Sequence, residues 1–152
     1  INENQFNRTA TVTVVVKVPT VCDGVETIEG TYLATTTATT PFDGPYDNTG
    51  SPYTVTITET GDGFLISDVT GGLYGEFYAA AYSDLGVQAL PATLTRDECE
   101  VSATDVPEDP GFEAAFGPNL LNATGNIAAD GTITLTYTNE SGDSGVTVLS
   151  PQ

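Results

Sequence analysis

Two acidic loops contain the side chains best suited to hold a cation. Their oxygen-bearing residues are Asp43, Asp47 and Asn48 in the first loop, and Asp105, Glu108 and Asp109 in the second. Carboxylate and amide oxygens on turns are the ligands that calcium takes in proteins. Neither loop has the spacing of an EF-hand, and turn residues that contact only water are the alternative interpretation. Calcium is therefore the ion that the sequence favours, but no metal site is assigned.

Aromatic side chains could form a platform on which a sugar ring stacks. The candidates are Tyr32, Tyr46, Tyr53, Tyr74, Tyr78, Tyr82, Phe64 and Phe77. Most of them alternate with polar residues, which is also the pattern of residues that pack in a core. The sequence thus makes a glycan a candidate partner without locating its site.

Catalytic chemistry has little support in this chain. It contains no histidine, which excludes triads and dyads that depend on one. It has no GxxxxGK[ST] or GxGxxG pattern to cradle a phosphate, and its two cysteines lie too far apart for a zinc site. The 21 acidic residues leave open only a glycosidase with paired carboxylates. We expect no enzyme, no catalytic residue and no cofactor.

The charge balance excludes two classes of partner. Three basic residues stand against 21 acidic ones, which gives a formal net charge of −18. Nucleic acids and anionic membrane surfaces are repelled by such a field. The chain also has no apolar run long enough to cross a bilayer, so we expect no membrane insertion.

The two cysteines, Cys22 and Cys99, are consistent with one disulfide formed in an oxidising compartment. Such a bond would close a loop of nearly eighty residues and contribute about 4.5 kcal/mol in the chain-entropy account. Two free buried thiols are the alternative. The disulfide interpretation predicts an extracellular or cell-surface location.

The elements that must position these side chains are short strands. They are expected at residues 30–39, 53–60, 64–69, 75–83, 87–95, 100–104, 122–128, 132–138 and 145–149. Period-two alternation and Gly-, Asp- and Asn-containing turns between them are typical of hairpins. Residues 105–118 are expected to form a loop with a short helical turn at 112–116. The chain is predicted to be all-β, an antiparallel β-sandwich or flattened barrel, without a helix of useful length.

A further strand is predicted at residues 9–18, TATVTVVVKV. Its alternation gives one apolar face, made by Ala10, Val12, Val14, Val16 and Val18. Residues 1–27 are interpreted as an N-terminal strand arm with a connector, and residues 28–152 as the all-β domain. An unpaired strand of this kind needs a partner, either in its own chain or in a neighbour.

Three segments resemble a β-rich domain found in surface lipoproteins and large secreted surface proteins of Bacteroidota. They are EGTYLATTT from residue 29, YTVTITETGDGFLISDVTGGLYG from residue 53 and GTITLTYTNESGDSGVTVL from residue 131. The resemblance implies a surface location, an immunoglobulin-like module upstream and no settled catalytic residues.

Two functions follow as hypotheses. In the first, the protein is a structural subunit of an extracellular filament, and its N-terminal strand completes the sheet of the next copy, head to tail. In the alternative, it is a glycan-binding, calcium-binding or spacer module of a larger bacterial surface protein.

Overall fold

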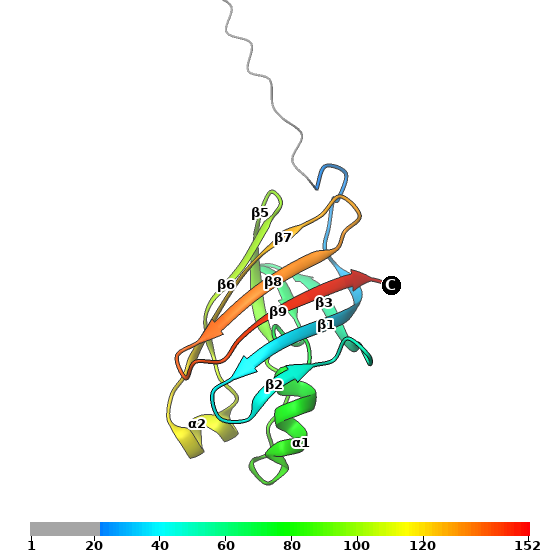
Figure 1. Cartoon of the computed structure of the whole chain (residues 1–152). Coiled ribbons are helices and arrows are strands. Elements are labelled where there is room, and N and C mark those ends of the chain that lie inside the picture. The colour runs from blue at the N-terminus through cyan, green and yellow to red at the C-terminus, as the bar shows by residue number, and fades with distance from the viewer. Residues whose placement is uncertain (1–21) are drawn as a thin grey trace, which may run out of the picture.

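The computed structural model describes residues 22–152, which form a closed antiparallel barrel of eight strands with one additional strand (Figure 1). The strands are β1 (Gly30–Thr40), β2 (Gly44–Asp47), β3 (Tyr53–Thr60), β4 (Gly63–Ile66), β5 (Ala92–Asp97), β6 (Glu100–Pro107), β7 (Leu120–Ile127), β8 (Ile133–Asn139) and β9 (Ser144–Pro151). Apart from β2, each strand pairs with its neighbours in sequence, and pairing of β1 with β9 closes the ring. The all-β prediction is confirmed, and of its two variants the barrel is the one observed.

Alternation along the strands determines which side chains fill the barrel. In β1, Ala34, Thr36 and Ala38 are buried, whereas in β8 the buried positions are Ile133, Leu135 and the tyrosine at 137. Successive side chains of a strand point to opposite faces, so threonines at the intervening positions face outward. The same alternation in β3 buries Val55 and Ile57, while Tyr53 is partly buried.

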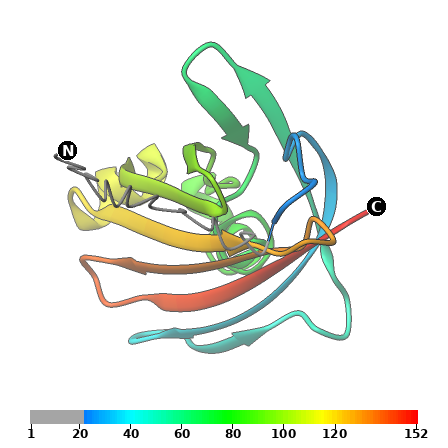
Figure 2. The same cartoon turned by 90° about the horizontal axis from the view of Figure 1, so that it is seen from above.

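The connection between β4 and β5 is helical; it projects inside the outline of the ring when viewed from above (Figure 2), and its α1 part lies at one end of the barrel (Figure 1). It consists of a π-helical segment η1 (Leu73–Tyr78), α1 (Ala79–Ala81) and a 3₁₀ turn η2 (Ser83–Leu85). The strand predicted at 75–83 is therefore wrong. The physical reason is that Tyr74 and Tyr78, which are four residues apart and so lie on one face of a helix, both enter the core together with Leu73.

A buried carboxylate starts this helical segment. Asp68 is fully buried, and its Oδ1 accepts hydrogen bonds from the backbone N–H and the hydroxyl of Thr70, at 2.9 and 2.6 Å. Its Oδ2 accepts from the N–H groups of Gly72 and Gly75, at 3.3 and 3.1 Å. These donors lie at a helix N-terminus, where N–H groups lack partners within the helix. Burial raises the pKa of Asp68, partly offset by these hydrogen bonds.

Polar contacts also attach the segment to the barrel wall. The Thr36 hydroxyl on β1 lies 2.9 Å from the Gly71 carbonyl and 2.8 Å from the Thr147 hydroxyl on β9. A side chain at Gly71, whose φ is +59°, would lie 2.5 Å from both threonines. The chain can pass this close to the wall only because the residue is glycine.

The remaining differences from the predicted elements are local. The loop expected between the first two strands contains the short strand β2, which pairs with β1 beyond the end of β3. Strand β6 extends to Pro107, across an irregularity between Ala103 and Val106. The expected helical turn is α2 (Pro110–Phe116), with Asp109 as its N-cap and proline in its first turn.

The predicted disulfide between Cys22 and Cys99 is present. It fastens the first described residues to the end of the barrel away from the helices (Figure 1). Arg96 strengthens this junction, because its guanidinium donates to the backbone carbonyls of Val25, Glu26 and Glu98. Among the described residues, no helix has the length and apolar character needed to span a membrane. The predicted strand at residues 9–18, with Ala10, Val12, Val14, Val16 and Val18, lies outside the described residues.

Candidate functional site

A pocket of about 610 Å³ opens at the end of the barrel where the helices lie. Four connections that are distant in sequence meet there: the β1–β2 turn, the end of the helical insertion, the β6–α2–β7 connection and the β8–β9 turn. Most of the lining residues are either aromatic or acidic. The aromatic ones are Phe42, Tyr78, Tyr82, Phe112 and Phe116, and the acidic ones are Asp43, Glu108, Glu140 and Asp143.

Two buried carboxylates belong to the inner part of the pocket. Glu108, which follows β6, is 7% exposed, and Asp143, in the β8–β9 turn, is 4% exposed. The hydroxyl of Tyr74 donates to Glu108 Oε1. The side-chain amide of Asn139 lies 3.0 Å from Asp143 Oδ2 and 3.3 Å from the Tyr74 hydroxyl. Tyr74 and Asn139 therefore connect the two acids in one hydrogen-bond network.

Both carboxylates hold protons more tightly than an exposed acid. Burial raises the pKa of Glu108, and hydrogen bonds from Tyr74 and Asn119 offset part of that rise. Burial likewise raises the pKa of Asp143, which Tyr78 and Asn139 partly offset. Removing a carboxylate from water disfavours its charged form, and among residues 22–152 no basic side chain lines this pocket to compensate.

The mouth of the pocket carries exposed aromatic side chains. Phe42 is 83% exposed and Phe116 is 66% exposed, and they are the two most exposed large hydrophobic side chains among residues 22–152. The Tyr82 hydroxyl lies 2.7 and 2.8 Å from the two carboxylate oxygens of Asp43. Thr40 holds the turn that presents Phe42, because its hydroxyl accepts from Asp43 N–H and donates to the Gly44 carbonyl.

Behind the mouth, two helical rows of rings pack against each other. One row is Tyr74, Tyr78 and Tyr82, and the other is Phe112 and Phe116 of α2. The ring centroids of Tyr78 and Phe112 are 5.1 Å apart, and those of Tyr82 and Phe112 are 5.2 Å apart. These separations are typical of tilted and edge-to-face aromatic pairs. The rows form a rigid wall, because each ring contacts at least one ring of the other row.

The first acidic loop does not assemble as a cation site. Asn48 is buried, where its Oδ1 accepts from Thr36 N–H at 2.5 Å and its amide donates to the Gly71 carbonyl. Asp47 accepts from Thr49 N–H within the turn. Asp43, by contrast, lies at the pocket. The three side chains predicted as cation ligands therefore take part in three separate contacts and do not form one site.

The acidic side chains of the second loop likewise take part in separate contacts. Asp109 caps α2 through Gly111 N–H, and Glu108 faces the pocket. Asp105 is exposed, with a φ of +52°, and its N–H donates to the side chain of Asn122. Within the described part of the chain, no three Asp, Glu, His or Cys side chains are grouped so as to hold a metal ion.

Of the eight aromatic residues predicted as a sugar platform, only Tyr78 and Tyr82 line the pocket. Sequence reasoning missed Phe42, Phe112 and Phe116. A signal was present for two of them, since Phe112 and Phe116 are four residues apart and follow Asp109-Pro110, a helix start. The spacing of Tyr74, Tyr78 and Tyr82 carries the same helical signal.

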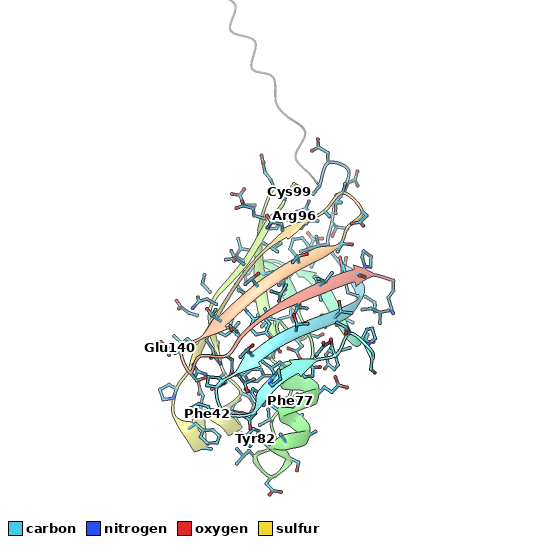
Figure 3. The ribbon with its side chains drawn as sticks, viewed as in Figure 1. Phe42, Phe77, Tyr82, Arg96, Cys99 and Glu140 are labelled. Carbon is cyan, nitrogen blue, oxygen red and sulfur yellow. A yellow bond between two sulfur atoms is a disulfide. The ribbon has the colours of Figure 1, made fainter. Side chains whose placement is uncertain are left out.

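The only basic residue in the described chain is remote from this pocket. Figure 3 shows Arg96 beside Cys99 at one end of the barrel, with Phe42 and Tyr82 near the other end. Arg96 is also engaged with three backbone carbonyls. Four carboxylates of the pocket therefore have no compensating cation among residues 22–152.

Comparison with known protein families identifies a relationship. A family model for the C-terminal domain of a Bacteroidota protein family matches residues 22–151. No curated protein and no solved structure matches the chain. The matched range contains nearly all of the described barrel, including the disulfide and every residue of the pocket. The chain therefore belongs to this family of Bacteroidota C-terminal domains.

Proposed function

We propose that this domain is a saccharide-binding module of a Bacteroidota surface or secreted protein, and that the pocket at the helical end of the barrel is its binding site. The observation that carries the proposal is the pairing of exposed rings at the mouth with buried oxygen acceptors inside. Phe42 and Phe116 offer apolar faces, while Glu108 and Asp143 offer carboxylate oxygens.

A sugar has surfaces that match both features. The C–H face of a pyranose packs on an aromatic ring, and its hydroxyl groups donate hydrogen bonds to carboxylates. Ligand sites in proteins are commonly concave, largely apolar and equipped with a few polar groups that fix orientation. The volume of about 610 Å³ lies within the range of such sites.

The proposal is for binding without a chemical step. The chain has no histidine, and the two inner carboxylates are already tied into hydrogen bonds with Tyr74, Asn139 and Tyr78. A rigid, hydrogen-bonded acid is suited to orienting a ligand hydroxyl. The surface or secreted location is supported by the disulfide and by the Bacteroidota family.

Binding of a panel of neutral and amino-sugar oligosaccharides, measured by calorimetric titration, tests the proposal. At least one saccharide should bind, and Phe42→Ala and Phe116→Ala should each weaken it by about tenfold, since stacking on one ring contributes about 1 kcal/mol or more. Leu65→Ala is the matched control, because Leu65 is also exposed but lies on β4 outside the pocket. Binding that survives both Phe variants, or no binding across the panel, would refute the proposal.

The filament hypothesis stays a prediction. Its donor strand lies outside the described residues, so support must come from an acceptor edge in the barrel. Each of the eight barrel strands has partners on both sides, and β2 is the described strand with one partner. A donor strand would therefore have to pair with β2, which contains Pro45 and spans four residues. Val14→Asp, which places a charge on the apolar face of the arm, should abolish any polymerisation observed by light scattering.

A further inference from the structure

We infer that the ligand of the pocket presents a positively charged amino or ammonium group, which lies among the aromatic rings and the carboxylates. This inference concerns the same pocket and rests on the proposed binding function. It adds the charge of the ligand, which the proposed function leaves open.

The first argument is charge balance. Asp43 and Glu140 lie exposed at the pocket, and Glu108 and Asp143 lie buried within it. Arg96, the one basic residue of the described chain, is held at the other end of the barrel (Figure 3). Buried charges in proteins are normally paired. A cationic ligand would supply the missing partner, whereas an anionic one would meet four carboxylates.

The second argument is the aromatic wall. Tyr78, Tyr82, Phe112 and Phe116 line the pocket and present rings at different tilts, with 72° between the planes of Tyr82 and Phe112. The part of each ring face that is open to the pocket attracts a cation through the ring quadrupole, and alkylammonium groups are recognised in this way. The Tyr82 hydroxyl donates to Asp43, which leaves its ring face as its means of attracting a ligand.

The third argument separates an organic cation from a metal ion. A metal ion such as calcium needs six or more oxygen ligands at short range. Among the described residues, no group of three acidic side chains is close enough to provide them. An ammonium group needs fewer oxygen partners than calcium and gains from contact with ring faces.

The test compares probes that differ in charge but not in shape. Choline and its neutral carbon isostere 3,3-dimethyl-1-butanol form one pair, and glucosamine and glucose form a second. Binding is followed by NMR from the side-chain amides of Asn119 and Asn139, which contact the pocket acids. At about 0.15 M salt, where the general field of the protein is screened, each cation should bind at least about tenfold more tightly than its neutral partner.

Charge variants place the cation in the pocket. Asp43→Asn and Glu140→Gln should each weaken choline binding severalfold, while preserving the size of the side chain. Glu59→Gln is the matched control, since it removes the same charge from the exposed end of β3 and should leave binding unchanged. A similar loss in all three variants would mean that the cation responds only to net charge, and would overturn the inference.

The outcomes distinguish this inference from the proposed function. Equal binding of choline and its isostere, or of glucosamine and glucose, would overturn the inference and leave saccharide binding intact. Shifts caused by choline without binding of any saccharide would refute the saccharide proposal and retain the cation site. No shift at Asn119 or Asn139 with choline at tens of millimolar would overturn the inference.

Discussion

The hydroxyl of Tyr74 donates a hydrogen bond to the buried carboxylate of Glu108, and so joins the helical insertion to the end of β6. The two residues are 34 positions apart in the chain. Their contact fixes one wall of the pocket relative to another. It also offsets part of the free-energy cost of burying Glu108, which has no cationic partner among residues 22–152.

Tyr74→Phe should therefore destabilise the domain by about 1–3 kcal/mol, because Glu108 would keep its burial and lose a donor. Chemical denaturation at neutral pH measures the change. Tyr137→Phe is the matched control, since the Tyr137 hydroxyl is buried and has no hydrogen-bond partner within the described chain. That variant should be neutral or slightly stabilising, and an equal loss in both variants would contradict the role given to the Tyr74 contact.

Asp68→Ala should cost about 3 kcal/mol or more. It removes the acceptor of three backbone N–H groups, those of Thr70, Gly72 and Gly75, which are then unsatisfied at the start of the helical insertion. The positions of the Tyr74 and Tyr78 rings depend on the start of the helical insertion, so the near-ultraviolet circular dichroism signal should weaken as well.

Asp130→Ala provides the control for Asp68→Ala. Asp130 accepts one backbone hydrogen bond, from Thr132, on the exposed β7–β8 turn. The control should change stability by no more than about 0.5 kcal/mol. Comparable losses of stability for the two variants would show that the buried position of Asp68 does not add to its effect.

Alternation made the strands predictable, but not the closure of the sheet. The pattern at residues 132–138 predicts a strand, and in β8 its alternation buries Ile133 and Leu135. Closure depends on the pairing of β1 with β9, in which Ala34 faces Leu149. Pairing between two strands that are far apart in the chain leaves no local signal in the sequence. A strand with one buried face has the same alternating pattern in a sandwich and in a barrel.

The pocket could not be predicted for a related reason. Phe42, Tyr82, Glu108 and Asp143 come from four connections, and only the closed barrel brings them together. The sequence also favours a strand where the helical insertion lies, because Phe77 and Tyr78 have high strand propensity and the run Ala79–Ala81 is short. The four-residue spacing of Tyr74, Tyr78 and Tyr82 indicates a helix instead, and the structure has helical turns there.

Removing the Cys22–Cys99 disulfide should destabilise the domain by about 4.5 kcal/mol in the chain-entropy account, since the bond joins residues 77 positions apart. The variant Cys22→Ser with Cys99→Ser should show a lower denaturation midpoint than the oxidised protein. Addition of reductant should shift the midpoint of the native protein and leave that of the variant unchanged. An unshifted midpoint would mean that the hydrogen bonds of Arg96 alone hold residues 22–29 in place.

Stability should increase as the pH falls from neutrality toward the ordinary pKa of a carboxylic acid. Burial raises the pKa values of Asp68, Glu108 and Asp143 above their ordinary range, so these groups bind more protons in the folded state than in the unfolded state. Their contribution to stability is then fully present below their ordinary pKa, and is lost as the pH rises through the raised value. Asp47 and Asp130 have lowered pKa values and oppose this trend only in more acidic solution.

Thermal unfolding between about pH 5 and pH 8 checks this dependence, for which we expect an increase of a few degrees on acidification. Asp143 faces Tyr78, Asn139 and Asp43, and Asp143→Asn keeps its size while removing its titration. That variant should show a flatter profile than the native protein. Glu59→Gln removes the same charge from an exposed position and should keep the native slope. If both variants flatten the profile equally, the pH dependence arises from net charge, and the buried acids of the pocket do not control it.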